Sequence, residues 1–305
     1  MNVQEIHFLQ AELGELNAIL EELPEDRVIE RSSLESRKRE VEEILAANPL
    51  PVREPVQVVL RFRGKPVVDQ HGVYADFGAA AVGAFEAAVA AVGSSQSTSL
   101  GSRGVLPNRD DYRLMITGTV PGSFGFELEE VGREDGSFPE LSLVESAISQ
   151  TRAILRASVG SDDELTDAIA GADPRALEAV RGFLKTLVDQ EAVCDLAFRD
   201  EVFEFTDVEQ VRRGRQRLSA DNIHEKEREL VGRFQGVLPK RRTFEFWVDE
   251  GDEVITGKVG AGIEDAGVIN RLLDVSVRIT VQVRQVGVGR PSFILLKYAA
   301  DVNNY

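Results

Sequence analysis

The segment VVDQHGVYAD holds three side chains that together can do chemistry: Asp69, His71 and Asp76. Two carboxylates and an imidazole can bind a divalent metal or relay protons. Such a group would suit a hydrolase that acts on a phosphorylated small molecule. The alternative is a turn, in which Asp76 caps the next helix and His71 meets a backbone group. We favour the turn, because no second cluster of ligands accompanies the three residues, and we predict neither a metal nor a cofactor.

Two basic clusters stand out in a chain with 52 acidic and 35 basic residues and a net charge of −17. Basic helices and barrel loops can grip the phosphates of a nucleic acid. Because Glu-rich segments adjoin both clusters, we favour solvated faces that pair with acidic neighbours. The alternative is contact with nucleic acid, as an accessory subunit of a bacterial antiviral defence or nuclease-type assembly. The clusters are Arg212, Arg213, Arg215 and Arg217 on one short helix, and Lys240, Arg241 and Arg242 in one hairpin turn.

A segment rich in serine and glycine, GSSQSTSLGSRG, spans residues 93–104. Backbone amides and hydroxyls in such a loop can cradle phosphate, and Arg103 and Arg109 could add charge. The chain has no G-x-x-x-x-G-K-[ST] pattern, and no G-x-G-x-x-G follows a strand. We therefore predict a flexible connection, and whether it has a function stays open.

The first two dozen residues carry the clearest structural pattern, six apolar residues spaced 3-4-3-4-3. This spacing lets a helix pack a narrow apolar seam against another helix. Ser32 and Glu35 form a capping-box pair that would begin a second helix, ending near Ala46. We predict a coiled-coil-like antiparallel hairpin over residues 1–50, packed either on the rest of the chain or on a partner or second copy. The seam consists of Ile6, Leu9, Leu13, Leu16, Leu20 and Leu23.

Residues 54–220 predict a mixed α+β domain that contains antiparallel hairpins. Gly93 would end the first long helix of this domain, and Pro121-Gly122 would form the turn of a hairpin. Capping residues precede the later helices. The predicted elements are strands over 56–62, 113–120 and 123–130, a hairpin over 193–205, and helices over 77–92, 143–158, 162–170, 174–189 and 206–218.

Residues 221–305 predict a small five-stranded antiparallel β-barrel, with the size and strand number of OB-like and SH3-like barrels. The apolar residues of 275–283 alternate with polar ones, which indicates one buried and one solvent-exposed face. This likeness concerns the fold and carries no function. The strands are expected at 228–237, 243–248, 254–259, 275–283 and 292–298, with a short helix near 264–273.

The number of cysteines and the hydropathy of the chain indicate in which cellular compartment the protein is expected. The single cysteine, Cys194, excludes an internal disulfide and a multi-cysteine metal site, and it fits a reducing cytoplasm. No apolar run approaches the length of a membrane span, and no secretory signal is visible. The sequence has a regular apolar seam for helix packing but no complete set of catalytic residues. We therefore predict a non-catalytic binding or assembly protein. It would form a homo-oligomer or bind a protein partner through residues 1–50.

Overall fold

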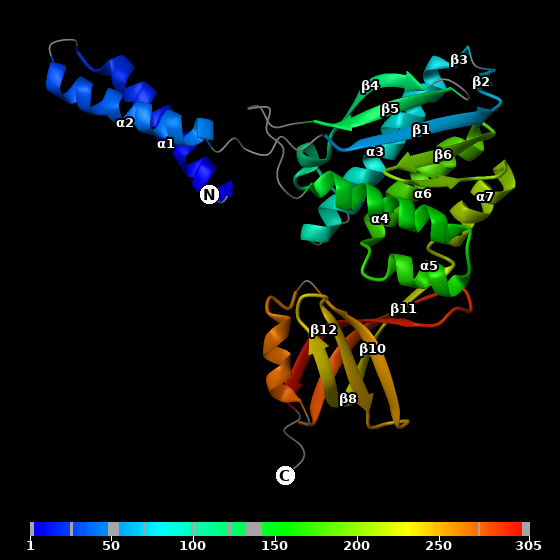
Figure 1. Cartoon of the computed structure of the whole chain (residues 1–305). Helices are drawn as coiled ribbons and strands as arrows, with labels where there is room; N and C mark the ends of the chain where they lie inside the picture. The colour runs from blue at the N-terminus through cyan, green and yellow to red at the C-terminus, as the bar shows by residue number, and fades with distance from the viewer. Residues whose placement is uncertain are drawn as a thin grey trace. The chain divides into compact units, whose positions relative to one another are not determined.

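The computed structural model describes residues 3–24, 27–47, 55–69, 71–98, 100–101, 103–120, 124–131, 142–260, 262–273 and 275–300. The chain divides into two compact units, residues 1–54 with 132–140 and residues 55–131 with 141–305. Helices and strands occur together in the second unit, so the predicted mixed α+β class is confirmed. That second unit contains two hydrophobic cores, one in an α+β body and one in a set of barrel strands (Figure 1).

Two helices, α1 (Val3–Glu22) and α2 (Val28–Ala47), form the hairpin of the first unit, and they pack along each other (Figure 1). The second helix begins before Ser32, so the predicted capping box at that residue is wrong. The amide of Arg31 already donates to the carbonyl of Arg27, 3.0 Å away. The Arg31 guanidinium donates to two carbonyls at the end of α1, which fixes the turn between the helices.

A five-stranded sheet with the order β4-β5-β1-β6-β7 forms the centre of the body. Alternate residues of β1 are buried because α3, α4 and α6 contribute to the same core on one face of the sheet. Cys194 lies on β6 opposite Phe62 of β1 and is fully buried, and this burial raises the pKa of its thiol. The strands are β1 (Gln57–Gly64), β4 (Leu114–Val120), β5 (Gly125–Glu130), β6 (Ala192–Phe198) and β7 (Glu201–Glu204), and the short pair β2 (Val67–Val68) and β3 (Gly72–Val73) stands apart.

Helix α3 (Ala75–Ser97) runs through the position where a stop was predicted. Gly93 lies inside the helix, and the ring of Tyr112 occupies the space that a Cβ atom at this position would need. The first part of the serine-rich segment is therefore helical, and the prediction of a flexible connection is wrong there. Ser94 is fully buried, and its hydroxyl donates to the carbonyl of Pro107.

Helix α3 is also the one described helix long and apolar enough to cross a membrane by length and composition alone, and 61% of that stretch is buried inside the fold. Its apolar surface is thus used largely for packing against the sheet and the other helices.

The capping residues place the later helices correctly. Ser142 accepts a hydrogen bond from the amide of Glu145, and Ser161 forms a complete capping box with Glu164. The last helix of the body is capped by Asp207 rather than Thr206, one residue later than predicted. The helices are α4 (Leu143–Ser158), α5 (Asp162–Ile169), α6 (Pro174–Asp189) and α7 (Val208–Arg217). The predicted Pro121-Gly122 turn lies outside the described residues.

Five strands of the last third pair in the cyclic order β10-β12-β11-β8-β9 around the second core (Figure 1). The pair β10–β12 is parallel, so the prediction that all strands are antiparallel is wrong at this point, while the other four neighbouring pairs are antiparallel. Their bounds are β8 (Ile223–Leu238), β9 (Thr243–Val248), β10 (Glu253–Val259), β11 (Val277–Val286) and β12 (Ser292–Ala300), and a 3₁₀ helix (Ala266–Leu272) lies between β10 and β11.

Candidate functional site

The predicted catalytic candidates lie at the surface of the body. Asp69, His71 and Asp76 are all exposed. The amide of His71 donates to the carbonyl of Val68, 2.9 Å away, in the turn between β2 and β3. Helix α3 begins at Ala75, so Asp76 lies in its first turn and does not cap it as predicted. Within the described ranges, no group of three histidine, cysteine or acidic residues could hold a metal ion. The segment forms a turn and a helix start, and the hydrolase hypothesis gains no support from it.

The predicted interaction seam is only partly covered within the hairpin. Leu16 and Val41 are the buried side chains of the described part of the hairpin. Large apolar side chains remain open beside them, with Phe8 70% exposed and Ile29 87% exposed. The half-buried seam residues are Leu9, Leu13, Leu20 and Leu23, whereas the side chain of Ile6 lies outside the described part.

The basic helix α7 is largely occupied by contacts within the chain. Arg212 pairs with Glu209 one helical turn away. Arg217 pairs with Asp162 at 2.8 Å and donates to the carbonyl of Ser158. The two remaining basic residues of the cluster differ in burial: Arg213 is exposed and Arg215 is half-buried.

The basic turn between β8 and β9 has a divided role. Arg242 donates to the carbonyls of Gly260 and Ile263, each at 2.7 Å, and so braces the end of β10. Arg241 lines a cavity together with Lys258. Lys240 is exposed.

A set of contacts, here called the clasp, fastens the β11–β12 loop to the first turn of α5. Asp162 accepts from the amide of Val288 at 3.2 Å, and Asp163 accepts from the amide of Arg290 at 2.6 Å. Gly289 permits this approach, because a Cβ atom there would lie 2.8 Å from the backbone of Asp162. The loop between β11 and β12 is therefore bound to the body through these hydrogen bonds.

The clasp should weaken in acid. The pKa of Asp162 lies below its ordinary value of 3.8, chiefly because of the hydrogen bond from Arg217, and the pKa of Asp163 is lowered chiefly by the Arg290 amide. A depressed carboxyl pKa stabilises the fold above the unfolded value and loses that contribution as pH falls through the folded value. We expect the melting temperature of wild type to fall more steeply below pH 3.8 than that of Asp162→Asn/Asp163→Asn. Equal slopes in calorimetry from pH 7 downward would contradict this.

A buried arginine joins the barrel strands to the body beneath the clasp. Arg284 of β11 is 1% exposed and pairs with Glu225 at 2.6 Å. Its guanidinium also donates to the carbonyls of Ile169 and Ala172, at the end of α5. The alternating pattern predicted that the face of β11 opposite its valines is exposed to solvent. This prediction is wrong at Arg284, which is buried on that face.

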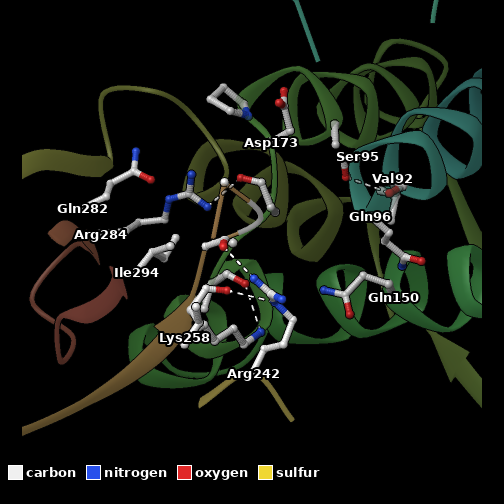
Figure 2. Close-up of a pocket in the computed structure, with 18 of the residues that line it drawn as sticks. Val92, Ser95, Gln96, Gln150, Asp173, Arg242, Lys258, Gln282, Arg284 and Ile294 are labelled. Atoms are coloured by element: carbon white, nitrogen blue, oxygen red, sulfur yellow. Dashed lines mark hydrogen bonds between the residues drawn. The ribbon is translucent and has the colours of Figure 1, made fainter. Parts of the chain in front are cut away.

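A cavity of about 670 Å³ lies beside this junction, and we call it the cleft (Figure 2). The ends of α3 and α4 and the α5–α6 loop form one wall, and strands β10, β11 and β12 with the β8–β9 turn form the other. Lys258 donates from its Nζ to the carbonyl of Ala170 at 3.1 Å, across the two walls. The polar lining residues are Ser95, Gln96, Gln150, Asp173, Arg241, Arg242, Lys258, Gln282 and Arg284.

The cleft concentrates positive charge in an acidic protein. Its lining includes four cationic side chains and one carboxylate, that of Asp173. The two Asp173 oxygens already accept from backbone amides, those of Arg175 at 2.8 Å and Leu100 at 3.0 Å. In the part of the chain that the structure describes, no carboxylate pairs with Arg241, Arg242 or Lys258. An anion is the chemical species that such a lining can hold.

Sequence reasoning found Arg241 and Arg242 but missed Lys258 and Arg284. Both missed residues lie on strands at polar positions, which the alternating pattern assigns to solvent. Only the pairing of β11 and β10 with their neighbours, and the docking of α5, bring them to one cavity. No local signal in the sequence could have grouped them.

Comparisons of this chain with protein families, with curated protein sequences and with solved structures find no match.

Proposed function

We propose that this chain is a non-catalytic binding and assembly protein and that the α1–α2 hairpin associates with a second copy. The observation that carries the proposal is the small core of the hairpin, which buries only Leu16 and Val41 in its described part. Units of this size rarely bury enough apolar surface alone and are commonly completed by disulfides, metals or oligomerisation. The hairpin contains no cysteine. A protein surface is the remaining way to cover its seam.

The exposed apolar residues suggest where that surface would dock. Phe8 and Ile19 are 70% and 48% exposed and lie eleven residues apart, which is three turns of a helix. They therefore share one side of α1. Val28 and Ile29 add exposed apolar surface at the start of α2.

Light scattering on the purified full chain tests this proposal. We expect wild type to have a mass near 67 kDa, twice the 33.5 kDa of one chain. Phe8→Ser/Ile19→Ser should be monomeric with unchanged helical circular dichroism, because both side chains are exposed and support no core. Val105→Ser, which removes an 89% exposed apolar residue elsewhere, is the matched control and should stay dimeric. A monomeric wild type, or a folded dimeric double variant, refutes the proposal.

A second candidate function is contact with nucleic acid, as an accessory subunit of a defence or nuclease-type assembly. Numbered in chain order, the five barrel strands neighbour each other as 1-2-3-5-4, with the helix between the third and fourth, an arrangement typical of OB-like barrels. Lys240 and Arg241 lie in the first of the loops that such barrels use. The β11–β12 loop, the other such loop, is held in the clasp, which disfavours this candidate.

Fluorescence anisotropy with labelled single- and double-stranded oligonucleotides, across a salt series, separates the two candidates. Binding that weakens with salt and is lost in Lys240→Gln/Arg241→Gln would support the nucleic-acid function. Absence of binding at low salt removes it. The cytoplasm stays the proposed location, because a single cysteine fits a reducing compartment.

A further inference from the structure

We propose that the cleft binds a small phosphorylated polyol, such as a sugar phosphate, with the phosphate on Arg241 and Lys258. This site is independent of the hairpin and of the association proposed for it. The cations of the cleft are unusual in their setting, because the chain holds 17 more acidic than basic residues. In such a chain a basic side chain readily finds a carboxylate, yet none pairs with these two within the described ranges. Both are exposed at the rim and so accessible to an incoming anion.

Arg242 strengthens the anion site without needing to touch the ligand. Its guanidinium is held by carbonyls of Val259, Gly260 and Ile263, which are dipoles and leave its net charge in place. The carbonyl of Arg242 in turn accepts from the amide of Val259 at 2.7 Å, beside Lys258. Figure 2 shows Arg242 and Lys258 next to each other on the barrel wall of the cleft. A phosphate at this wall would meet a fixed cationic surface.

The opposite wall carries amides suited to hydroxyl groups. Gln150 donates from Nε2 to the carbonyl of Ala168 at 2.7 Å, which holds the amide and leaves its oxygen as an acceptor. Gln96 accepts from the hydroxyl of Ser146 at 2.9 Å through Oε1, which leaves its NH₂ group as a donor. Both amides lie on the body side of the cleft in Figure 2. Neutral donors and acceptors of this kind fit the hydroxyls of a polyol.

Size and lining narrow the ligand further. A volume of about 670 Å³ falls within the range of small-molecule sites. Among the described residues no aromatic side chain lines the cleft, so a nucleobase would find no stacking partner in that lining. The apolar lining is aliphatic and includes Val92, Ile154 and Ile294. A compact phosphorylated chain or ring of hydroxyls matches these features better than a nucleotide or a nucleic-acid strand.

Isothermal titration calorimetry on the full chain tests the proposal with ribose 5-phosphate, inorganic phosphate and ribose as probes. We expect saturable binding of ribose 5-phosphate, weaker binding of inorganic phosphate, and none of ribose. Arg241→Gln/Lys258→Gln should weaken the binding of ribose 5-phosphate by at least about tenfold, since two charge-assisted hydrogen bonds are lost. Lys240→Gln, next to Arg241 but outside the lining, is the matched control and should bind like wild type.

The hydroxyl contacts have a separate readout. Gln96 is exposed, so Gln96→Ala should fold normally. This substitution should weaken the binding of ribose 5-phosphate by about three- to tenfold and leave the binding of inorganic phosphate unchanged. The polyol assignment is overturned if inorganic phosphate binds wild type as tightly as ribose 5-phosphate. The site itself is overturned if binding of no phosphorylated probe saturates by about 10 mM. It is also overturned if Lys240→Gln loses as much affinity for ribose 5-phosphate as the double variant.

Discussion

Replacing Arg284 with methionine should lower the free energy of unfolding of the second unit by about 2–4 kcal/mol. The side chain is 1% exposed, and its removal takes the cation from the Glu225 carboxylate, whose side chain is 30% exposed and keeps a hydrogen bond from Gln282. The carbonyls of Ile169 and Ala172 lose the donor that satisfies them at the end of α5. Each buried carbonyl left without a donor carries a desolvation penalty of roughly 1–3 kcal/mol.

Urea denaturation measures this effect. Trp247, the one tryptophan of the chain, lies in the barrel strands and reports on them by fluorescence, while far-ultraviolet circular dichroism reports mainly on the helices. We also expect the two signals of Arg284→Met to separate, because the body and the barrel strands lose one of the contacts that join them. Arg278→Met is the matched control on the same strand, since Arg278 and its partner Glu229 are both exposed and such pairs contribute at most about 1 kcal/mol. Equal losses in both variants would show that burial of Arg284 is not what matters.

Gly93→Ala should destabilise the protein by about 1–3 kcal/mol, the range observed for overpacked cores. The usual expectation is the reverse, because alanine is favoured over glycine in a helix by up to about 1 kcal/mol. Here a Cβ atom would lie 2.7 Å from Cζ of Tyr112 and closer still to other ring atoms. Tyr112 is 2% exposed, so its ring has little room to move away.

Gly83→Ala provides the comparison within the same helix. Nothing lies within 4 Å of a Cβ atom at Gly83, so this substitution should stabilise the protein by about 0.5–1 kcal/mol. The two variants should therefore shift the urea midpoint in opposite directions. A stabilising Gly93→Ala would mean that Tyr112 can leave the helix surface without loss.

Local chemistry predicted the body helices well. Ser142, Ser161 and Asp173 mark helix starts because their side chains accept hydrogen bonds from amides only a few residues away. The barrel strands were also found, because alternation along each strand needs no knowledge of its neighbours. Errors arose where a distant residue decides the outcome. A stop was predicted at Gly93, but α3 continues to Ser97, and the glycine instead makes room for the ring of the distant Tyr112.

The cleft shows the same limit for function. Lys258, Gln150 and Arg284 are far apart in the sequence and carry no common motif. They share a cavity only because the barrel strands dock on α5 and the α5–α6 loop. Asp69, His71 and Asp76 lie close in the sequence, yet they occupy an exposed turn. Closeness along the chain was thus a poor guide to a binding cavity in this fold.

Burial of Cys194 at the middle of the sheet has a practical consequence. It is the one thiol of the chain, and a maleimide or disulfide reagent can reach it only when the strands around it separate. Because β6 pairs with β1 and β7, the modification rate measures how often the central sheet opens. A thiol reagent added to the unaltered protein can therefore measure the rate of local opening of the body. This rate is obtained separately from that of the barrel strands and without an engineered label.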